Sequence, residues 1–308
     1  MAHDLSIRKD LTLTFGDSHD GVIGIPGITR DGHVIEISYF FGDAKPKNII
    51  GISSQTGCPM SCAFCELGQE SFARNLTPEE FREQVLLMLD EAARHGFHPD
   101  VTPHKVTVAN TGEPLLNPGL IDGLELVAET LSASFKVSTV MPATRIAKET
   151  LARLADFSAR CRHPVQLQIS LISTSERQRQ GMAGARLAGF GEIREAAETW
   201  RRKNPNGRKI NVSLILTSGM AADVDDVFNR LPPDLFRFRF RDYVPTAHGE
   251  SNGLAVIQSS RLSDIKDRFR ERGYDAGDWA SPTPTEWRFG LAGNVIRRMY
   301  LEMTKRAR

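Results

Sequence analysis

Cysteine, aromatic residues and net charge are all scarce in this sequence, and each shortage excludes a class of protein. The 308 residues include four cysteines, 7% aromatic residues and nearly equal numbers of basic and acidic residues, which gives a formal net charge of +1. A near-neutral chain has no bulk electrostatic reason to bind nucleic acid, although a local basic face can still do so. Three of the four cysteines fall within eight residues, which is more typical of metal ligands than of a disulfide framework.

The sequence also lacks a membrane segment and a leader. No apolar run approaches the roughly 20 residues that a helix needs to cross a bilayer. The first residues, Met1 to Leu5, mix charges and lack the apolar stretch of a signal peptide. We therefore expect a cytoplasmic protein without membrane association. Its 40% of hydrophobic residues are enough for a packed core.

Strand and helix patterns alternate through most of the chain. Strands are expected at 34–40, 49–53, 105–110, 135–140, 165–171, 209–216 and 235–240. Helices are expected from Pro78 to just before Gly96 and at 118–132, 144–157, 188–202, 221–230 and 259–272. Six consecutive strand–helix units predict an α/β fold with a parallel sheet, either open or curved into a partial barrel.

The clustered cysteines lie on a loop between the strand at 49–53 and the first helix. This segment, Gly57–Cys65, is hereafter the cysteine loop, and it spaces Cys58, Cys62 and Cys65 as C-x3-C-x2-C. Three thiolates on one loop suit three corners of an iron–sulfur cluster and leave one iron open, which is a catalytic arrangement. A zinc site of three cysteines and a histidine is the alternative. Its nearest downstream histidine is His95, at the end of the expected helix.

The spacing, with Phe64 before the last cysteine, resembles that of the radical S-adenosylmethionine (SAM) superfamily. Further motifs, in order along the chain, are similar to those of the RlmN/Cfr family of RNA adenine methylases. These are Ser53–Cys58, Phe72–Thr77, Thr111–Asn117, Val137–Val140 and Ile169–Leu171. The resemblance implies a partial (β/α)6 TIM-like barrel over residues 46–245. A short β-rich lead-in would occupy 1–45, and a divergent C-terminal extension over 246–308 would cover the active site.

The resemblance also implies the cofactors. Cys58, Cys62 and Cys65 would hold a [4Fe–4S] cluster, and S-adenosylmethionine would bind at the open iron. An external one-electron reductant such as flavodoxin or ferredoxin would supply the electron. Cleavage of the cosubstrate would then give a 5′-deoxyadenosyl radical.

Five further positions would contact the cosubstrate, and they fall in the cysteine loop or at the carboxyl ends of expected strands: Phe64, Gly112, Glu113, Ser138 and Ser170. A glycine lets the backbone approach a ligand closely, and a carboxylate accepts bonds from an ammonium group. The two serine hydroxyls suit a ribose or a carboxylate, and the aromatic ring would pack near the adenine. The alternative is that these residues only cap helices and turns, and that Phe64 is a core aromatic.

The sequence departs from the RlmN/Cfr pattern in the parts that serve RNA methylation. That family carries a methyl-bearing cysteine near the C-terminus and an accessory RNA-binding region before the barrel. Here no cysteine follows Cys161, and only 57 residues precede Cys58. The stretch that corresponds to the cysteine region is 286–294. A methyl relay through a C-terminal protein cysteine therefore has no thiol to use.

The candidates for hydrogen or proton handling are weaker. They are Cys161, which precedes an expected strand and so lies at the far end of a barrel, and Tyr243 and His248, which follow the last barrel strand. That strand alternates arginine and phenylalanine over 237–241. An arginine that points into the barrel would suit a phosphorylated or carboxylated substrate.

Three functions are compatible with these features. The first is a radical SAM enzyme that abstracts hydrogen from a small molecule, such as a nucleoside, a sugar or a biosynthetic intermediate. The alternative is a shortened enzyme that modifies RNA or a nucleotide base, with RNA possible but not favoured because the chain is near-neutral. A non-catalytic metal-binding or regulatory module is the third, and the Gly112–Pro114 motif argues against it because a structural cluster needs no cosubstrate pocket.

Overall fold

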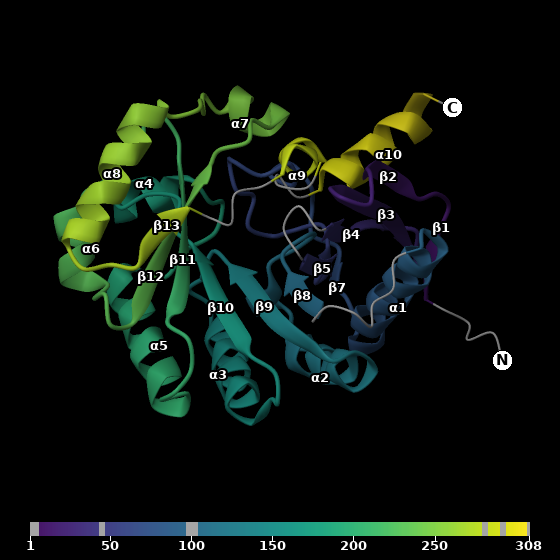
Figure 1. Ribbon diagram of the computed structural model, residues 1–308, viewed down its shortest axis with the longest axis horizontal. Coiled ribbons are helices and arrows are strands. Elements are labelled where there is room, and N and C mark those ends of the chain that lie inside the picture. The colour runs from purple at the N-terminus through teal and green to yellow at the C-terminus, as the bar shows by residue number, and fades with distance from the viewer. Residues whose placement is uncertain (1–5, 43–46, 97–103, 279–282, 290–293, 307–308) are drawn as a thin grey trace.

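A computed structural model describes residues 6–42, 47–96, 104–278, 283–289 and 294–306. Within these residues, eleven strands form one mixed sheet with helices along its outer side (Figure 1). The strand order is β1-β3-β4-β5-β8-β9-β10-β11-β12-β13, and β2 pairs with β3. Two short strands, β6 (Gln55–Thr56) and β7 (Arg74–Asn75), pair separately.

The barrel part of the sheet is parallel. Its strands are β5 (Lys47–Ile52), β8 (His104–Val108), β9 (Ala133–Thr139), β10 (Val165–Ser170), β11 (Ile210–Leu216), β12 (Phe236–Asp242) and the short β13 (Ala276–Asp278). The helices between them are α1 (Pro78–Arg94), α2 (Leu120–Thr130), α3 (Arg145–Arg160), α4 (Glu176–Gly181), α5 (Phe190–Lys203), α6 (Val224–Arg230), α7 (Ala247–Ser251) and α8 (Ser259–Glu271). Six strands, β5 and β8 to β12, are each followed by a helix. The partial (β/α)6 barrel is confirmed.

Helix α1 forms as its sequence predicts. Thr77 accepts a hydrogen bond from the backbone of Glu80, whose carboxylate accepts one from the Thr77 backbone, and Pro78 occupies the first turn. Such a capping box satisfies two backbone donors that a helix start otherwise leaves open. Phe81 and Val85 are buried on the inner face of α1, and His95 caps its end.

Phenylalanines on the strands pack against phenylalanines on the outer helices. Phe135 of β9 meets Phe157 of α3, with ring centroids 5.7 Å apart. Phe238 and Phe240 of β12 both contact Phe269 of α8, at 4.6 and 5.3 Å. Because side chains alternate along a strand, the residues between these phenylalanines face the other way, into the barrel.

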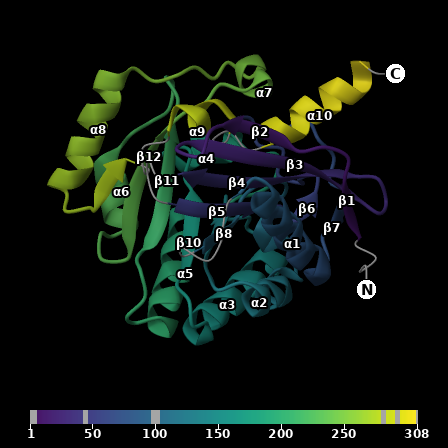
Figure 2. The ribbon, with the colours of Figure 1, turned by 45° about the vertical axis from the view of Figure 1, so that its right-hand side comes forward.

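The lead-in is β-rich, as expected, and its strands continue the barrel sheet. They are β1 (Ile7–Lys9), β2 (Leu13–Gly16), β3 (Gly21–Thr29) and β4 (Val34–Gly42), all antiparallel, and β4 pairs with β5. The C-terminal helices α9 (Pro284–Phe289) and α10 (Val295–Arg306) pack on this part (Figure 2). A methyl group at Gly24 would lie 1.9 Å from the side chain of Ile296, so α10 lies close against β3. The boundaries at 45 and 245 stay predictions.

Among the described residues, no helix combines the length and apolar character that a membrane crossing requires.

Candidate functional site

The cysteine loop follows β5 at the carboxyl end of the barrel strands. Positive φ angles at Gly57 (72°) and Ser61 (45°) turn the backbone tightly. The loop is tied to the segment after α4, because the amide of Ala63 donates to the carbonyl of Met182 (2.9 Å) and that of Gly184 donates to Met60 (2.8 Å). The sequence motif therefore folds into a compact, anchored loop.

All three loop cysteines are free thiols in a largely apolar surrounding. Cys62 is buried, and Cys58 and Cys65 are half-buried. Burial raises the pKa of Cys58 to about 12, that of Cys65 to about 11, and that of Cys62 well above its usual range. Thiols of this kind stay protonated until a metal displaces the proton. In the described part of the chain, no three His, Cys, Asp or Glu side chains are already gathered around one metal position. His95, the histidine of the zinc alternative, contacts Thr14 (3.5 Å) and Glu91 (3.4 Å) at the end of α1.

A buried arginine lies behind the loop. Arg179 of α4 is 2% exposed, and its guanidinium donates to the backbone oxygens of Val140 (2.6 Å) and Ala188. Its Nε atom is buried and has no hydrogen-bond partner among the described residues. Burial lowers the pKa of Arg179 to about 10, and its charge favours the thiolate form of Cys62. The sequence offered no signal for this residue, because α4 is short and otherwise polar.

Glu113 lies at the end of the strand beside the loop, as expected. Its carboxylate accepts hydrogen bonds from the Thr139 hydroxyl (2.6 Å) and from the amides of Val140 (3.0 Å) and Leu115 (3.1 Å). The bond from Leu115 caps a 3-10 turn at Pro114–Leu116, so the capping alternative describes part of the role of Glu113. A carboxylate has about four acceptor positions, so one remains for a ligand donor. Burial raises the pKa of Glu113 to about 7 despite these bonds.

Gly112 needs to be glycine. Its φ angle is +103°, and a methyl group there would lie 2.6 Å from the Cβ atom of Gln55. The side chain of Gln55 in turn accepts from the amide of Glu113 (2.8 Å). The glycine thus lets the chain turn against the strand that leads into the cysteine loop.

The remaining cosubstrate candidates lie near the same end of the barrel. Ser138 and Ser170 face into the barrel at the ends of β9 and β10, and Gln168 donates to the Ser138 hydroxyl (3.2 Å). Phe64 is partly buried and packs against the apolar residues around Cys62 as well as the main core. Part of the Phe64 side chain therefore belongs to the hydrophobic core, as the alternative interpretation holds.

The turn that carries His248 lies beside the cysteine loop, and Tyr243 supports that turn through a bond from the Thr246 amide to its hydroxyl (3.4 Å). The Thr246 hydroxyl, between them in the chain, donates to the carbonyl of Phe64 (3.4 Å). A methyl group at Gly68 would lie 2.1 Å from the imidazole of His248, so that ring rests on the segment just after the loop. Tyr243 is 2% exposed. The structure therefore places His248 next to the cysteine loop and Tyr243 beneath the turn that carries it.

Cys161 does not join them. It caps the end of α3, ahead of β10, where its amide donates to the carbonyl of Phe157 (2.8 Å). It lines a surface pocket between α2 and α3 with residues such as Glu125 and His163. That is the amino end of the barrel strands, opposite the cysteine loop, as the sequence predicts.

The sequence reasoning missed a link from the C-terminal helix to the site. The Thr111 hydroxyl donates to Oδ1 of Asn294 (2.6 Å), just before α10. The buried carboxylate of Glu36 accepts from the amides of Asn294 (2.8 Å) and Arg297 (3.1 Å), and burial raises its pKa. An acidic residue within the apolar strand 34–40 was the available signal. The bonds connect the residue before Gly112 to the far end of the chain.

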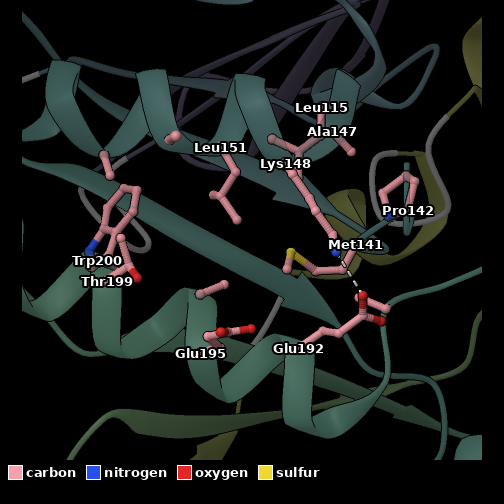
Figure 3. Close-up of a pocket in the computed structure, with 14 residues that line it drawn as sticks. Leu115, Met141, Pro142, Ala147, Lys148, Leu151, Glu192, Glu195, Thr199 and Trp200 are labelled. Atoms are coloured by element: carbon pink, nitrogen blue, oxygen red, sulfur yellow. Dashed lines mark hydrogen bonds and ion pairs between the residues drawn. The ribbon is translucent and has the colours of Figure 1, made fainter. Parts of the chain in front are cut away.

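A pocket of about 250 Å³ lies behind the site, between α3 and α5 (Figure 3). Its wall is mostly alanine and other apolar side chains, among them Leu151 and Trp200, and Lys148 pairs with Glu192 across its mouth (2.9 Å). It is on the helix side of the sheet and contains none of the cysteines. It does not compete with the cysteine loop as a catalytic centre.

Comparisons with known proteins agree with this geometry. The family model of the radical SAM superfamily matches residues 52–220. A probable dual-specificity RNA methyltransferase RlmN of Chlorobium phaeovibrioides is 26% identical over 294 residues, which cover 88% of this chain and 74% of that protein. Dual-specificity RNA methyltransferase RlmN 2 of Myxococcus xanthus is 31% identical over 243 residues, covering 75% and 58%. The RlmN protein of Desulfotalea psychrophila is 29% identical over 208 residues, covering 65% and 54%.

The chain spans between 54% and 74% of the length of these relatives. Among solved structures, a radical SAM methyltransferase from Sphaerobacter thermophilus superposes with a TM-score of 0.72 at 21% identity, covering 87% of this chain and 75% of that one. At that identity the likeness establishes the fold alone. Since the family model covers more than half of the sequence, the chain belongs to the radical SAM superfamily, whose enzymes use a [4Fe–4S] cluster and S-adenosylmethionine.

Proposed function

We propose that this radical SAM enzyme modifies a base of RNA or of a ribonucleotide. The observation that carries the proposal is the similarity to proteins named as RNA methyltransferases along most of the chain. This reverses the preference for a small molecule that the near-zero net charge suggested. Net charge is a weak guide here, because a local basic face is enough to bind one segment of RNA.

We assign Cys58, Cys62 and Cys65 as the protein ligands of the cluster. The donor set fits, since three unpaired thiols lie on one anchored loop and Fe–S clusters are held by cysteine thiolates. The positive charge of Arg179 partly offsets the burial and the neighbouring negative charges that raise the pKa of Cys62. When bound, the cluster would supply the electron for reductive cleavage of S-adenosylmethionine, the chemistry that leads to hydrogen abstraction from a substrate.

The neighbouring residues would bind and orient the cosubstrate. Glu113 would accept from its ammonium group with the remaining acceptor position, and the tight turn at Gly112 would bring backbone groups close to it. Ser138 and Ser170 would bond the ribose or the carboxylate, and Phe64 would cover the adenine. Three hydrogen bonds hold the Glu113 carboxylate, so it would keep its position without a ligand. A catalytic site needs preorganisation of this kind.

One route of reaction lacks a required residue in the sequence. No cysteine occurs beyond Cys161, so we do not assign a methyl relay through a C-terminal thiol. His248 lies against Gly68, just after the cysteine loop, and Tyr243 lies under the turn at Thr246 that bonds to Phe64. We propose that they, and not Cys161, handle the proton at the substrate. The electron donor would be a cytoplasmic flavodoxin or ferredoxin.

Mass spectrometry of RNA nucleosides tests the proposal. We expect a strain without this gene to lose or gain one modified nucleoside. A plasmid copy of the gene should restore the normal profile, and a copy with Cys62→Ala should not. A nucleoside profile identical in all four strains would overturn the proposal.

A small-molecule substrate stays the second candidate, because the residues after Cys161 contain no cysteine that could carry a methyl group. Under reducing conditions, the purified enzyme would then release 5′-deoxyadenosine in response to a metabolite fraction free of RNA. Release only with RNA or ribonucleotides would exclude this candidate.

A further inference from the structure

Residues 182–188, hereafter the bridging segment, join the cysteine loop to the loop that follows β9. At the start of the segment, Met182 and Gly184 form the two backbone hydrogen bonds with the cysteine loop described above. At its end, the amide of Ala188 donates to the carbonyl of Met141 (2.8 Å). The bridging segment is therefore bonded to a different loop at each end.

Arg179 holds the bridging segment in this position. Its guanidinium donates to the carbonyl of Ala188 and to the carbonyl of Val140 (2.6 Å), so one side chain joins the segment to the loop after β9. The backbone carbonyl of Arg179 accepts from the amide of Met182 (3.2 Å). A guanidinium suits such a crossing between two backbones, because its N–H donors have a fixed planar arrangement.

Val140 links Arg179 to both halves of the site. It packs in one buried apolar cluster with Cys62 of the cysteine loop and Leu187 of the bridging segment. Its amide donates to the carboxylate of Glu113 (3.0 Å). A single residue therefore separates Arg179 from the buried cysteine and from the proposed acceptor of the cosubstrate ammonium group.

The bonds of Arg179 do not neutralise its charge. Both acceptors are backbone carbonyls, and the side chain is 2% exposed. Within the residues that the structure describes, its Nε atom has no hydrogen-bond partner, and Glu176 on the same helix pairs with Arg230 (2.8 Å). Burial lowers the pKa of Arg179 to about 10, so the guanidinium stays charged at neutral pH. Little water screens a buried charge of this kind, so it acts on the groups around it more strongly than an exposed one.

We infer that Arg179 is a positioning residue of the cluster site, which holds the cysteine loop through the bridging segment and raises the reduction potential of a cluster bound there. The inference rests on the proposed function, because it assumes a cluster on the three loop cysteines. Reduction adds one electron from the external flavodoxin or ferredoxin and no atom, so the reduced cluster carries one more negative charge. A buried cation nearby stabilises that form, since the charge around a cluster is among the factors that set its potential.

Two substitutions of Arg179 separate its charge from its bonds. Arg179→Met removes the charge and both bonds, whereas Arg179→Lys keeps the charge and replaces the planar donor group with a compact ammonium group. Arg177→Met is the matched control, because Arg177 is exposed on the same helix. Spectroelectrochemical titration of the anaerobically reconstituted enzyme gives the reduction potential. Iron content gives the amount of cluster, and urea denaturation gives the stability.

We expect Arg179→Met to shift the reduction equilibrium roughly tenfold toward the oxidised cluster, which corresponds to a potential lower by about 59 mV for one electron. Arg179→Lys should retain most of the wild-type potential but unfold at a lower urea concentration, because one ammonium group replaces the fork that joins the two carbonyls. Arg177→Met should match the wild type in potential and in stability.

Equal potentials of Arg179→Met and the wild type, at full iron content, would overturn the inference. So would equal losses of potential in Arg179→Met and Arg179→Lys, because the change would then come from altered packing and not from the lost charge. Where Arg179→Met does not fold, Arg179→Gln, which keeps an amide donor without the charge, is compared with Arg179→Lys in the same way.

These outcomes are distinct from a failure of the proposed function. A lower potential in Arg179→Met, together with an RNA nucleoside profile that does not depend on the gene, would leave the role of Arg179 standing and refute base modification. A reconstituted wild-type enzyme that binds no iron would refute the cluster assignment itself.

Discussion

The hydrogen bond between the side chains of Thr111 and Asn294 joins two positions 183 residues apart, and its contribution to stability can be tested by mutation. The Asn294 side chain accepts from Thr111 (2.6 Å) and donates to the carbonyl of Asn110 (3.2 Å), and the residue is 2% exposed. Its φ angle is +62°, which glycine adopts without strain. Asn294→Gly therefore removes the two side-chain bonds and keeps the backbone.

We expect Asn294→Gly to lower the free energy of unfolding by about 2–4 kcal/mol. Two hydrogen bonds contribute about 1 kcal/mol each, and a comparable cost arises because the Thr111 hydroxyl loses its acceptor, while still accepting from the Glu36 amide, and the Asn110 carbonyl loses its donor. Asn294→Ala should cost about 1 kcal/mol more, because an alanine resists a positive φ angle. Urea denaturation followed by circular dichroism gives these differences.

The exposed turn residue Asn206 provides the matched control, and Asn206→Gly should change stability by less than about 0.5 kcal/mol. Combining Asn294→Gly with Thr111→Val should cost less than the sum of the single changes by about 1 kcal/mol, because both delete the same bond. Additive costs, or an effect of Asn294→Gly no larger than that of the control, would refute the reasoning.

Three further predictions concern the site and its surroundings. Replacing any one of the three loop cysteines with alanine should abolish iron binding, as measured by iron content and visible absorption, whereas Cys161→Ala should keep full iron content. Gly112→Ala should destabilise the protein by about 1–3 kcal/mol in urea denaturation, because its methyl group would meet Gln55 at a φ angle of +103°. Hydrogen bonding to Arg74 holds the pKa of Asp31 well below its usual range, so the stabilisation from that pair is present above about pH 4 and is lost as pH falls below it. Asp31→Asn should accordingly flatten the fall in stability on acidification, and an unchanged acid profile would contradict the assignment.

Much of the architecture could be predicted because its causes are local. The capping box of Thr77 and Glu80 and the proline between them define the start of α1 within four residues of chain. Alternating apolar residues define the barrel strands, and the predicted and observed bounds differ by one or two residues for most strands. The spacing of the cysteine loop is likewise a local pattern, and it was enough to indicate the cofactor.

The hydrogen-bond partners of individual side chains could not be predicted from the sequence. Glu113 was expected to face a ligand, and the structure shows three of its acceptor positions already filled by Thr139, Val140 and Leu115. Thr139 and Val140 lie next to Glu113 because of the register between β8 and β9. That register is a contact between distant segments, and neither segment's sequence indicates it.

The sequence by itself indicated the family, and through that resemblance the partial barrel, and it predicted the three cluster cysteines, because each motif lies within a short segment of the chain. Only the tertiary structure placed Arg179 near Cys62 and joined Asn294 to Thr111. These arrangements depend on strands pairing across the sheet and on a C-terminal helix packing against the lead-in. Contacts over such separations form only when the whole barrel is folded, and the distinctive chemistry of this site lies in those contacts.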